Sequence, residues 1–281
     1  MKPNDIDLTN AFEKALSRHG YGFQYAVLKE AEALYFRDKS PWLPWVQEFP
    51  VEVQGKGTRI DLVFKHKRRR LFLVCECKRS NPAMSNWCFA RAPWPNDSGF
   101  STDSYMEMIR YDGNRVQFEL QTLIPSDRIF QIAIEVKTGR KGDSQGASSD
   151  DIENAATQAC RGYNGLIQFF TGDRVHSLVN INEPIGFMTT IITTAKIFAT
   201  EAEVTSPNID TGEISKLDPP LKSRDWIWYD YPQSPGLKHS VQDSQPSSYL
   251  REIFYREFIR RIAIVNSSGI ASFLGSPIWG L

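Results

Sequence analysis

Several features that mark common protein classes are scarce or missing in this 281-residue sequence. It has four cysteines, Cys75, Cys77, Cys88 and Cys160, and no Cys-x-x-Cys pair. This usage favours reduced thiols in a cytoplasmic protein over a disulfide framework. Lysine plus arginine and aspartate plus glutamate both number 33, so the chain carries no net charge. A nucleic-acid binder often has a basic total, so binding of that kind must rest here on local charge.

Long apolar runs are missing as well. The N-terminal residues Met1–Asp5 are polar and include no secretory apolar stretch. The most apolar later segment, Ile185–Ala199, is rich in threonine and interrupted by Lys196. It is too short and too β-branched for a membrane helix, so it predicts a buried strand or strand pair. The loop Gly139–Ser149 lacks the Lys-Ser/Thr ending of a phosphate-binding P-loop, which argues against nucleotide hydrolysis there.

Two strands joined by a basic turn form the most informative pattern that is present. Residues 59–64 and 71–78 are rich in aliphatic and aromatic residues, which predicts strands. The turn between them, residues 65–70, reads Lys-His-Lys-Arg-Arg-Arg. If the strands pair antiparallel about the middle of this turn, Asp61 lies opposite Glu76, on one face of the hairpin.

The opposite face of the hairpin supports this register. Ile60, Leu62 and Phe64 would lie opposite Cys77, Cys75 and Leu73 and form an apolar surface fit for burial. A slip of one residue would move charged side chains into that surface.

The expected charged face has the chemistry of a metal site. Two neighbouring carboxylates, here Asp61 and Glu76, repel each other and need a cation or a shared proton between them. Oxygen ligands of this type suit Mg²⁺ or Mn²⁺, which keep several waters and also bind substrate phosphate. Lys78, on the same face, would sit beside the metal, where it can orient a water and neutralise charge on phosphorus. The alternative is an ordinary exposed hairpin face with a salt bridge.

The segment Glu48–Lys78 resembles the core of the PD-(D/E)xK, or restriction-endonuclease-like, nuclease superfamily. Asp61, Glu76 and Lys78 match its motif, whereas Ile60 replaces the name-giving proline. The resemblance implies an α/β fold with a mixed central β-sheet flanked by helices. It also implies Mg²⁺- or Mn²⁺-dependent cleavage, usually of DNA, with a role in restriction or host defence. Cys77, whose thiol is expected to face the core, could lend its main-chain carbonyl to the metal, as could Val74.

A second helix, over residues 23–37, is expected to follow a short helix over residues 8–19. Its apolar stripe predicts packing on the sheet. In the superfamily a helical glutamate at this point joins the metal shell, and both Glu30 and Glu32 lie on this helix. We select Glu32 because it lies on the stripe, where an unpartnered carboxylate would be costly. The alternative is a solvated glutamate.

A second acid-x-lysine tripeptide, Glu135-Val136-Lys137, competes with the first. Its segment alternates as a strand, and residues 116–120 are a plausible partner. On a symmetric pairing Gln117 rather than an acid would face Glu135. The tripeptide is therefore interpreted as the next strand of the same sheet, with Lys137 near the substrate.

Other segments allow two interpretations or only a coarse one. The aromatic residues between Asn81 and Phe100, with Arg91 among them, would either contact nucleic acid or cover the core. The basic turn is expected to be solvated, at the end of the hairpin away from the carboxylates. A long helix should start at Asp150, and its apolar stripe predicts burial. Later segments predict a strand at 226–231, a helix at 249–261 and a short strand at 262–265.

Together these patterns predict an α/β protein with a restriction-endonuclease-like core over residues 1–205 and a C-terminal strand and helix extension over residues 206–281. The expected function is metal-dependent hydrolysis of DNA, with Asp61 and Glu76 as metal ligands, Lys78 assisting the water and Glu32 completing the site. A scaffold without activity and a ribonuclease remain alternatives. A homodimer or a complex with other subunits is equally compatible with the sequence, and no membrane partner is expected.

Overall fold

The computed structural model describes residues 3–92, 103–112, 115–125, 129–137, 147–172, 184–206, 208–214, 216–233 and 259–280. The first half contains helices α1 (Pro3–Arg18) and α2 (Tyr21–Phe36) and strands β1 (Trp42–Val53), β2 (Lys56–His66), β3 (Leu71–Lys78), β4 (Asn86–Arg91), β5 (Asp103–Asp112), β6 (Arg115–Pro125), β7 (Ile129–Phe130) and β8 (Ile132–Val136). The second half contains β9 (Ala147–Ser148), α3 (Asp150–Thr171), β10 (Ile185–Thr193), β11 (Lys196–Glu203), β12 (Lys222–Arg224), β13 (Trp226–Pro232), β14 (Ile259–Asn266) and α6 (Ile270–Leu274). Short 3₁₀ helices cover Pro82–Met84, Ser267–Gly269 and Pro277–Gly280.

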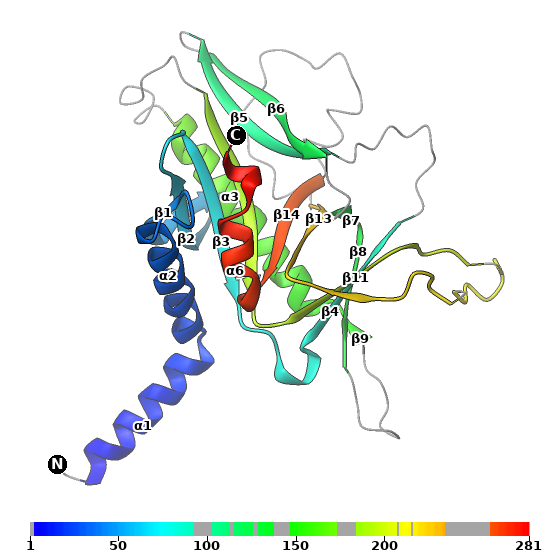
Figure 1. Cartoon of the computed structure of the whole chain (residues 1–281). Coiled ribbons are helices and arrows are strands. Elements are labelled where there is room, and N and C mark those ends of the chain that lie inside the picture. Colours follow the sequence, from blue (N-terminus) through cyan, green and yellow to red (C-terminus); the bar gives the residue numbers. More distant parts are fainter. Residues whose placement is uncertain are drawn as a thin grey trace.

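A mixed sheet of nine of the described strands forms the centre of the molecule (Figure 1). Its main path runs β1-β2-β3-β10-β14-β13-β7, and β5 and β6 extend it beside the start of β10. Strand β2 is antiparallel to both of its neighbours, β1 and β3, whereas β3, β10 and β14 are parallel. The segment predicted as a C-terminal extension therefore supplies β14, which lies between β10 and β13 inside the central sheet. The general α/β class with a mixed, helix-flanked sheet is confirmed.

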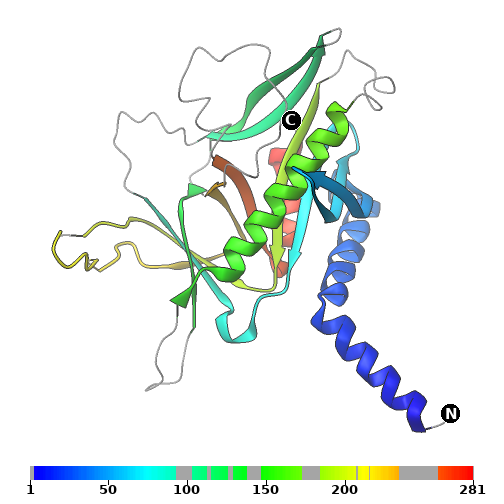
Figure 2. The ribbon, with the colours of Figure 1, turned by 180° about the vertical axis from the view of Figure 1, so that it is seen from behind.

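Helices cover both faces of this sheet (Figures 1 and 2). On one face α2 and α6 pack over β2 and β3, and the predicted stripe of Val27, Ala31 and Leu34 is buried there. Phe36, the last residue of the helix, is 78% exposed.

Helix α3 covers the other face, and its predicted apolar stripe is buried along its length. A Cβ atom added at Gly165 would lie only 2.6 Å from Val51 of β1. The helix backbone thus approaches the sheet more closely than any side chain at this position would permit. At the other end of the helix, Asp151 in its first turn lies beside Lys78 at the C-terminal end of β3.

A second sheet, with strand order β12-β11-β4-β8-β9, lies beside the first. The segment after Lys78 contains its strand β4, and Trp87 and Phe89 are fully buried. These two rings therefore cover the core, and Trp94 lies outside the described residues. Of the two interpretations that the sequence allowed, covering of the core is the one that holds for Trp87 and Phe89.

The predicted position of the second acid-x-lysine strand is also wrong. Strand β8 pairs with β4 and β9 in the second sheet, not with the strands of the first tripeptide. Its expected partner at residues 116–120 lies in β6, which pairs with β5. The sequence favoured residues 116–120 as the partner because they lie close to β8 along the chain. In the structure the backbone hydrogen-bonding groups of β6 are instead paired with those of β5.

The predicted helix at residues 249–261 lies mostly outside the described residues. Where the structure resumes, at Ile259, the chain is already in strand β14, which extends beyond the expected strand 262–265. The strand predicted at 226–231 is confirmed as β13. In the described part of the chain no helix is both long enough and apolar enough to cross a membrane.

Candidate functional site

The β2–β3 hairpin has the register expected from its sequence. Leu62 pairs with Cys75, Val63 with Val74 and Phe64 with Leu73. Leu62, Leu73 and Cys75 are all buried against the α2 side of the sheet. The ladder ends at the Leu62–Cys75 pair, one position before Asp61 and Glu76. The two carboxyl groups therefore lie at the end of the hairpin, where the strands separate and leave room between them.

The predicted face is wrong at one position, Ile60. It is buried as expected, but it packs on the α3 side of the sheet together with Val74, and its Cγ1 lies 3.0 Å from a Cβ built on Gly162. The change of face coincides with Glu48 on the neighbouring strand, whose φ of 51° departs from extended backbone. The regular alternation assumed from the sequence holds from Leu62 onward but stops at this irregularity.

Asp61 is held at the open end of the hairpin by its own side chain. Its Oδ2 accepts a hydrogen bond of 2.7 Å from the backbone N–H of Cys77, which takes the place of the next rung of the ladder. Burial raises the pKa of Asp61 to about 6, the Cys77 hydrogen bond opposes this rise, and the charge of Glu48 adds to it. The carboxylate is thus fixed in position and destabilised in its charged form.

Glu76 is subject to the same conflict. Burial raises its pKa well above the ordinary value, and the neighbouring charges of Asp61 and Glu48 raise it further, whereas Lys78 lowers it. Asp61, Glu48 and Lys78 thus all act electrostatically on Glu76, and only Lys78 among them favours its charged form.

Lys78 is oriented by a residue that the sequence reading did not select. Its Nζ lies 3.1 Å from Oδ1 of Asp151, in the first turn of α3. The other oxygen of Asp151 accepts a hydrogen bond of 3.3 Å from the backbone N–H of Asn81, just beyond β3. Nothing in the local sequence separates Asp151 from the other acids of that turn. Only the packing of α3 across the sheet identifies it.

The second acid-x-lysine tripeptide has a different role from the first. The Glu135 side chain is 2% exposed, and its Oε1 accepts hydrogen bonds from the backbone N–H groups of Asp151 at 2.6 Å and Ile152 at 3.0 Å. A carboxylate at this position satisfies free N–H groups at a helix N-terminus and interacts favourably with the helix dipole. Glu135 therefore caps α3, which begins at Asp150 as the sequence predicted.

The predicted helical glutamate does not belong to the cluster. Glu32 forms an ion pair of 2.8 Å with Lys29, one turn away on the same helix, and Glu30 is exposed. From α2 the cluster receives Gln24 instead, whose Nε2 donates to Glu48 Oε1 at 2.8 Å and to the carbonyl of Asp61 at 3.0 Å. The spacing of residues within α2 favoured Glu32. In the structure the part of the helix that contacts the cluster carries Gln24 instead.

Glu48 is the acid that sequence reasoning missed. It comes from β1, and the side chains of Gln24 and of Arg59, at 3.7 Å, contact its carboxylate. Its positive φ, unusual for a residue with a side chain, orients it at the irregularity opposite Asp61. Glu48 opens the segment that resembles the nuclease core, but no sequence feature marks it as a site residue.

Cys77 offers only its backbone to this site. Its Sγ lies 3.9 Å from Sγ of Cys75 and packs against the apolar α2 side of the sheet, as expected from alternation. The contact with Cys75 and burial raise the pKa of the Cys77 thiol well above its usual value, so the thiol stays protonated. A protonated thiol is a poor metal ligand, which leaves the main-chain carbonyl as the group that could bind a cation.

The chemistry of the donor set decides whether a metal ion fits here. Within the described residues, no three or more histidine, cysteine, aspartate or glutamate side chains are arranged to hold a metal ion. Mg²⁺ typically uses only one or two protein carboxylates and completes its shell with water and substrate phosphate. Asp61 and Glu76 supply that number, and both have raised pKa values that a bound cation would reverse. The residues present therefore fit a two-carboxylate site and not a cage made only of protein ligands.

Comparisons with models of known protein families, with curated proteins and with solved structures find no match to this chain.

Proposed function

We propose that this protein is a metal-dependent nuclease that hydrolyses phosphodiester bonds of DNA. The observation that carries the proposal is the pair of half-buried carboxyl groups, Asp61 and Glu76, which repel each other at the open end of a hairpin beside Lys78. A fold gains nothing in stability from such a pair, because each group raises the cost of ionising the other. Unfavourable ionisable groups of this kind are concentrated at functional sites.

Asp61 and Glu76 would hold a Mg²⁺ or Mn²⁺ ion, with the main-chain carbonyl of Cys77 as a further candidate ligand. When bound, such an ion polarises phosphoryl oxygen and lowers the pKa of a bound water. The hydrogen bond from Cys77 N–H keeps Asp61 oriented without the ion, so less ordering is needed on binding. Gln24 supports the same residue from the other side through its hydrogen bond to the Asp61 carbonyl, and Glu48 accepts a second bond from the same amide group.

Lys78 would supply the remaining positive charge. Its ammonium group is held by Asp151, so it is directed across the end of β3 rather than free in solvent. At this position it would orient the attacking water and stabilise negative charge that develops on the phosphoryl oxygens. The Lys78–Asp151 pair is partly exposed, with 23% and 26% of the two side chains accessible, so substrate phosphate can compete with Asp151 for the lysine.

Calorimetry with Mn²⁺ and a cleavage assay test the proposal together. Wild type should bind Mn²⁺ and should cut DNA only when a divalent ion is present. Asp61→Ala should lose most of the affinity, since it removes one of the two carboxylates. Glu32→Ala is the matched control and should bind and cut as wild type does, because Glu32 pairs with Lys29 outside the cluster.

The substrate panel should contain plasmid, linear duplex, single-stranded DNA and RNA of similar length. Cleavage of RNA alone would move the assignment to a ribonuclease on the same site. Equal Mn²⁺ binding by wild type and Asp61→Ala, or no cleavage of any nucleic acid with any divalent ion, would leave the alternative of a scaffold that keeps the carboxyl pair without its chemistry.

A further inference from the structure

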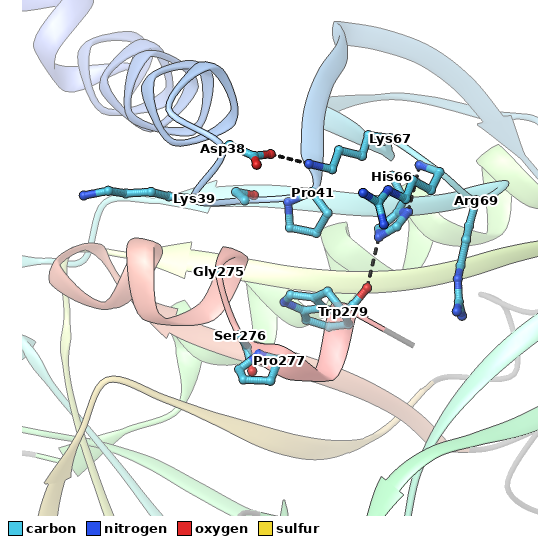
Figure 3. Close-up of a pocket in the computed structure, with 12 residues that line it drawn as sticks. Asp38, Lys39, Pro41, His66, Lys67, Arg69, Gly275, Ser276, Pro277 and Trp279 are labelled. Atoms are coloured by element: carbon cyan, nitrogen blue, oxygen red, sulfur yellow. Dashed lines mark hydrogen bonds and ion pairs between the residues drawn. The ribbon is translucent and has the colours of Figure 1, made fainter.

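The end of the hairpin away from the carboxyl pair borders a separate pocket (Figure 3). Three segments that are distant in sequence form its walls: residues 38–41 after α2, residues 66–69 in the hairpin turn, and residues 275–279 after α6. Its volume is about 380 Å³, within the range of about 300–1,000 Å³ typical of small-molecule sites. A strand rises ~3.3 Å per residue, so the five residues from Asp61 to His66 separate pocket and carboxyl pair by roughly 17 Å.

The pocket is fixed in shape by a buried histidine. His66 is 4% exposed; its Nε2 lies 3.0 Å from the carbonyl oxygen of Trp279, and its Nδ1 accepts a hydrogen bond of 3.2 Å from the backbone N–H of Arg68. With Nδ1 as acceptor, Nε2 carries the proton and donates to Trp279. Burial, reinforced by the charges of Arg69, Lys67 and Arg68, keeps the pKa of His66 below its usual value. The hairpin turn and the C-terminal segment are thus joined by a neutral ring.

The charge of the lining is strongly one-sided. Four cationic residues, Lys39, Lys67, Arg68 and Arg69, line the pocket against a single carboxylate, Asp38. Asp38 is already engaged by Lys67 in an ion pair, which also lowers its pKa. Among the described residues no carboxylate forms an ion pair with Arg68 or Arg69. In a chain with no net charge this is a local excess of positive charge that lacks a counter-anion.

Figure 3 shows how these side chains lie around the space. Lys67 reaches toward Asp38 and His66 points to the Trp279 carbonyl below it, whereas Arg69 extends from the turn away from Asp38 and Lys39 extends away on the other side. Lys67 is already paired with Asp38, so the adjacent residues Arg68 and Arg69, which both line the pocket, are the cations left for a ligand. Adjacent like charges repel, and an anion bound between them would offset that repulsion.

We propose that this pocket binds a phosphate group through the adjacent turn residues Arg68 and Arg69. The planar guanidinium groups of two adjacent arginines match the geometry of phosphate oxygens. The phosphate has two sources that fit: a small phosphate compound that occupies the pocket, or a backbone phosphate of the nucleic acid held ~17 Å from the cleavage site.

Binding assays without divalent metal test this proposal independently of cleavage. Pyrophosphate binding is measured by calorimetry, and binding of a short DNA duplex by fluorescence anisotropy in the presence of EDTA. The test variant is the double substitution Arg68→Ala and Arg69→Ala. Lys65→Ala is the matched control, because Lys65 is an exposed cation of the same hairpin that does not line the pocket. Thermal unfolding checks that each variant is folded.

The double variant should lose about tenfold or more in affinity for at least one probe, while Lys65→Ala stays within about twofold of wild type. Loss for pyrophosphate alone identifies a small phosphate compound as the ligand, and loss for the duplex identifies the nucleic-acid backbone. Equal losses of affinity in the double variant and in Lys65→Ala would show that binding depends only on general positive charge. That result would overturn the proposed phosphate site. Unchanged affinity of the double variant for both probes, or no binding of either probe by wild type, would overturn it as well.

Discussion

The two acid-x-lysine tripeptides of this chain look alike in sequence and differ in almost every physical respect. Glu76-Cys77-Lys78 ends a strand of the central sheet, and burial and nearby acids raise the pKa of its glutamate well above the usual value. In the second tripeptide, Glu135 is almost completely buried and accepts two backbone hydrogen bonds of 2.6 and 3.0 Å. The surroundings of Glu76 thus oppose its charged form, whereas the carboxylate of Glu135 has two hydrogen-bond donors.

The difference shows that the motif alone does not define a site. A carboxylate that finds two N–H donors at a helix N-terminus is stabilised in its charged form and has little left to offer a metal. A carboxylate next to another acid lacks such compensation and gains from a cation. The two tripeptides are also connected, because Asp151 donates its N–H to Glu135 and pairs through its side chain with Lys78. The second tripeptide therefore holds in place the helix end that orients the first.

The largest expected effect separates the two lysines. Lys78→Ala removes the cation beside the carboxyl pair and should lower the rate of DNA cleavage by roughly two to four orders of magnitude, while Mn²⁺ still binds. Lys137→Ala should leave the rate within a few-fold of wild type, since β8 lies in the second sheet. Single-turnover cleavage and calorimetry on both variants measure this. A larger loss in Lys137→Ala would assign the active site to the second tripeptide.

The next effect concerns stability and the second glutamate. Glu135→Ala would leave two N–H groups at the start of α3 without their acceptor, so the free energy of unfolding should fall by about 2–4 kcal/mol. Glu135→Gln keeps one side-chain oxygen and should lose about half as much. Urea unfolding of the two variants gives the values. If Glu135→Ala proves as stable as wild type, the capping role is wrong.

The first tripeptide and its partner Asp61 should behave in the opposite way, because their charges oppose folding. The pKa of Asp61 is about 6 in the folded protein against 3.8 as its ordinary value, so the folded state keeps a proton that the unfolded chain loses. Stability should therefore fall as the pH rises from about 4 through about 6, by on the order of 3 kcal/mol at most. Asp61→Asn removes this charge while its oxygen can still accept from Cys77 N–H.

Asp61→Asn should accordingly be more stable than wild type at about pH 7, with a melting temperature several degrees higher and a weaker pH dependence. Saturating Mn²⁺ should stabilise wild type at the same pH and leave the variant unchanged. Thermal unfolding across the pH range, with and without the ion, measures both effects. Parallel pH profiles for wild type and variant would show that the carboxyl pair carries no such penalty.

The smallest effect tests the connection between the two tripeptides. Asp151→Asn keeps the backbone N–H that Glu135 accepts but removes the charge that pairs with Lys78. Cleavage should slow by about fivefold through kcat with little change in KM, since a partly exposed ion pair contributes about 1 kcal/mol. The pH profile of kcat should shift as well, a change that a purely structural residue would not cause. An unaltered profile together with an unaltered rate would contradict a positioning role for Asp151.

The local content of the site could be predicted from the sequence. Alternation of apolar residues specifies the register of β2 and β3, because a slip of one residue would bury charge, and the observed pairs agree with it. The same reasoning identified the buried stripes of α2 and α3. These features depend on neighbours within a few residues along the chain or across one turn.

The parts that could not be predicted depend on contacts between distant segments. Glu48, Gln24 and Asp151 come from three other elements, and each joins the site only through the way its element crosses the sheet. The apolar stripe of α2 favoured Glu32 over other residues of the helix. In the structure Glu32 forms an ion pair with Lys29, one turn away, outside the site. Glu135 repeats the acid-x-lysine pattern, and only its contact with the first turn of α3 distinguishes a helix cap from a metal ligand. The sequence determines which residues alternate on one strand pair; tertiary packing decides which distant charges meet, because the electrostatic energy of a carboxylate depends on every neighbour in space.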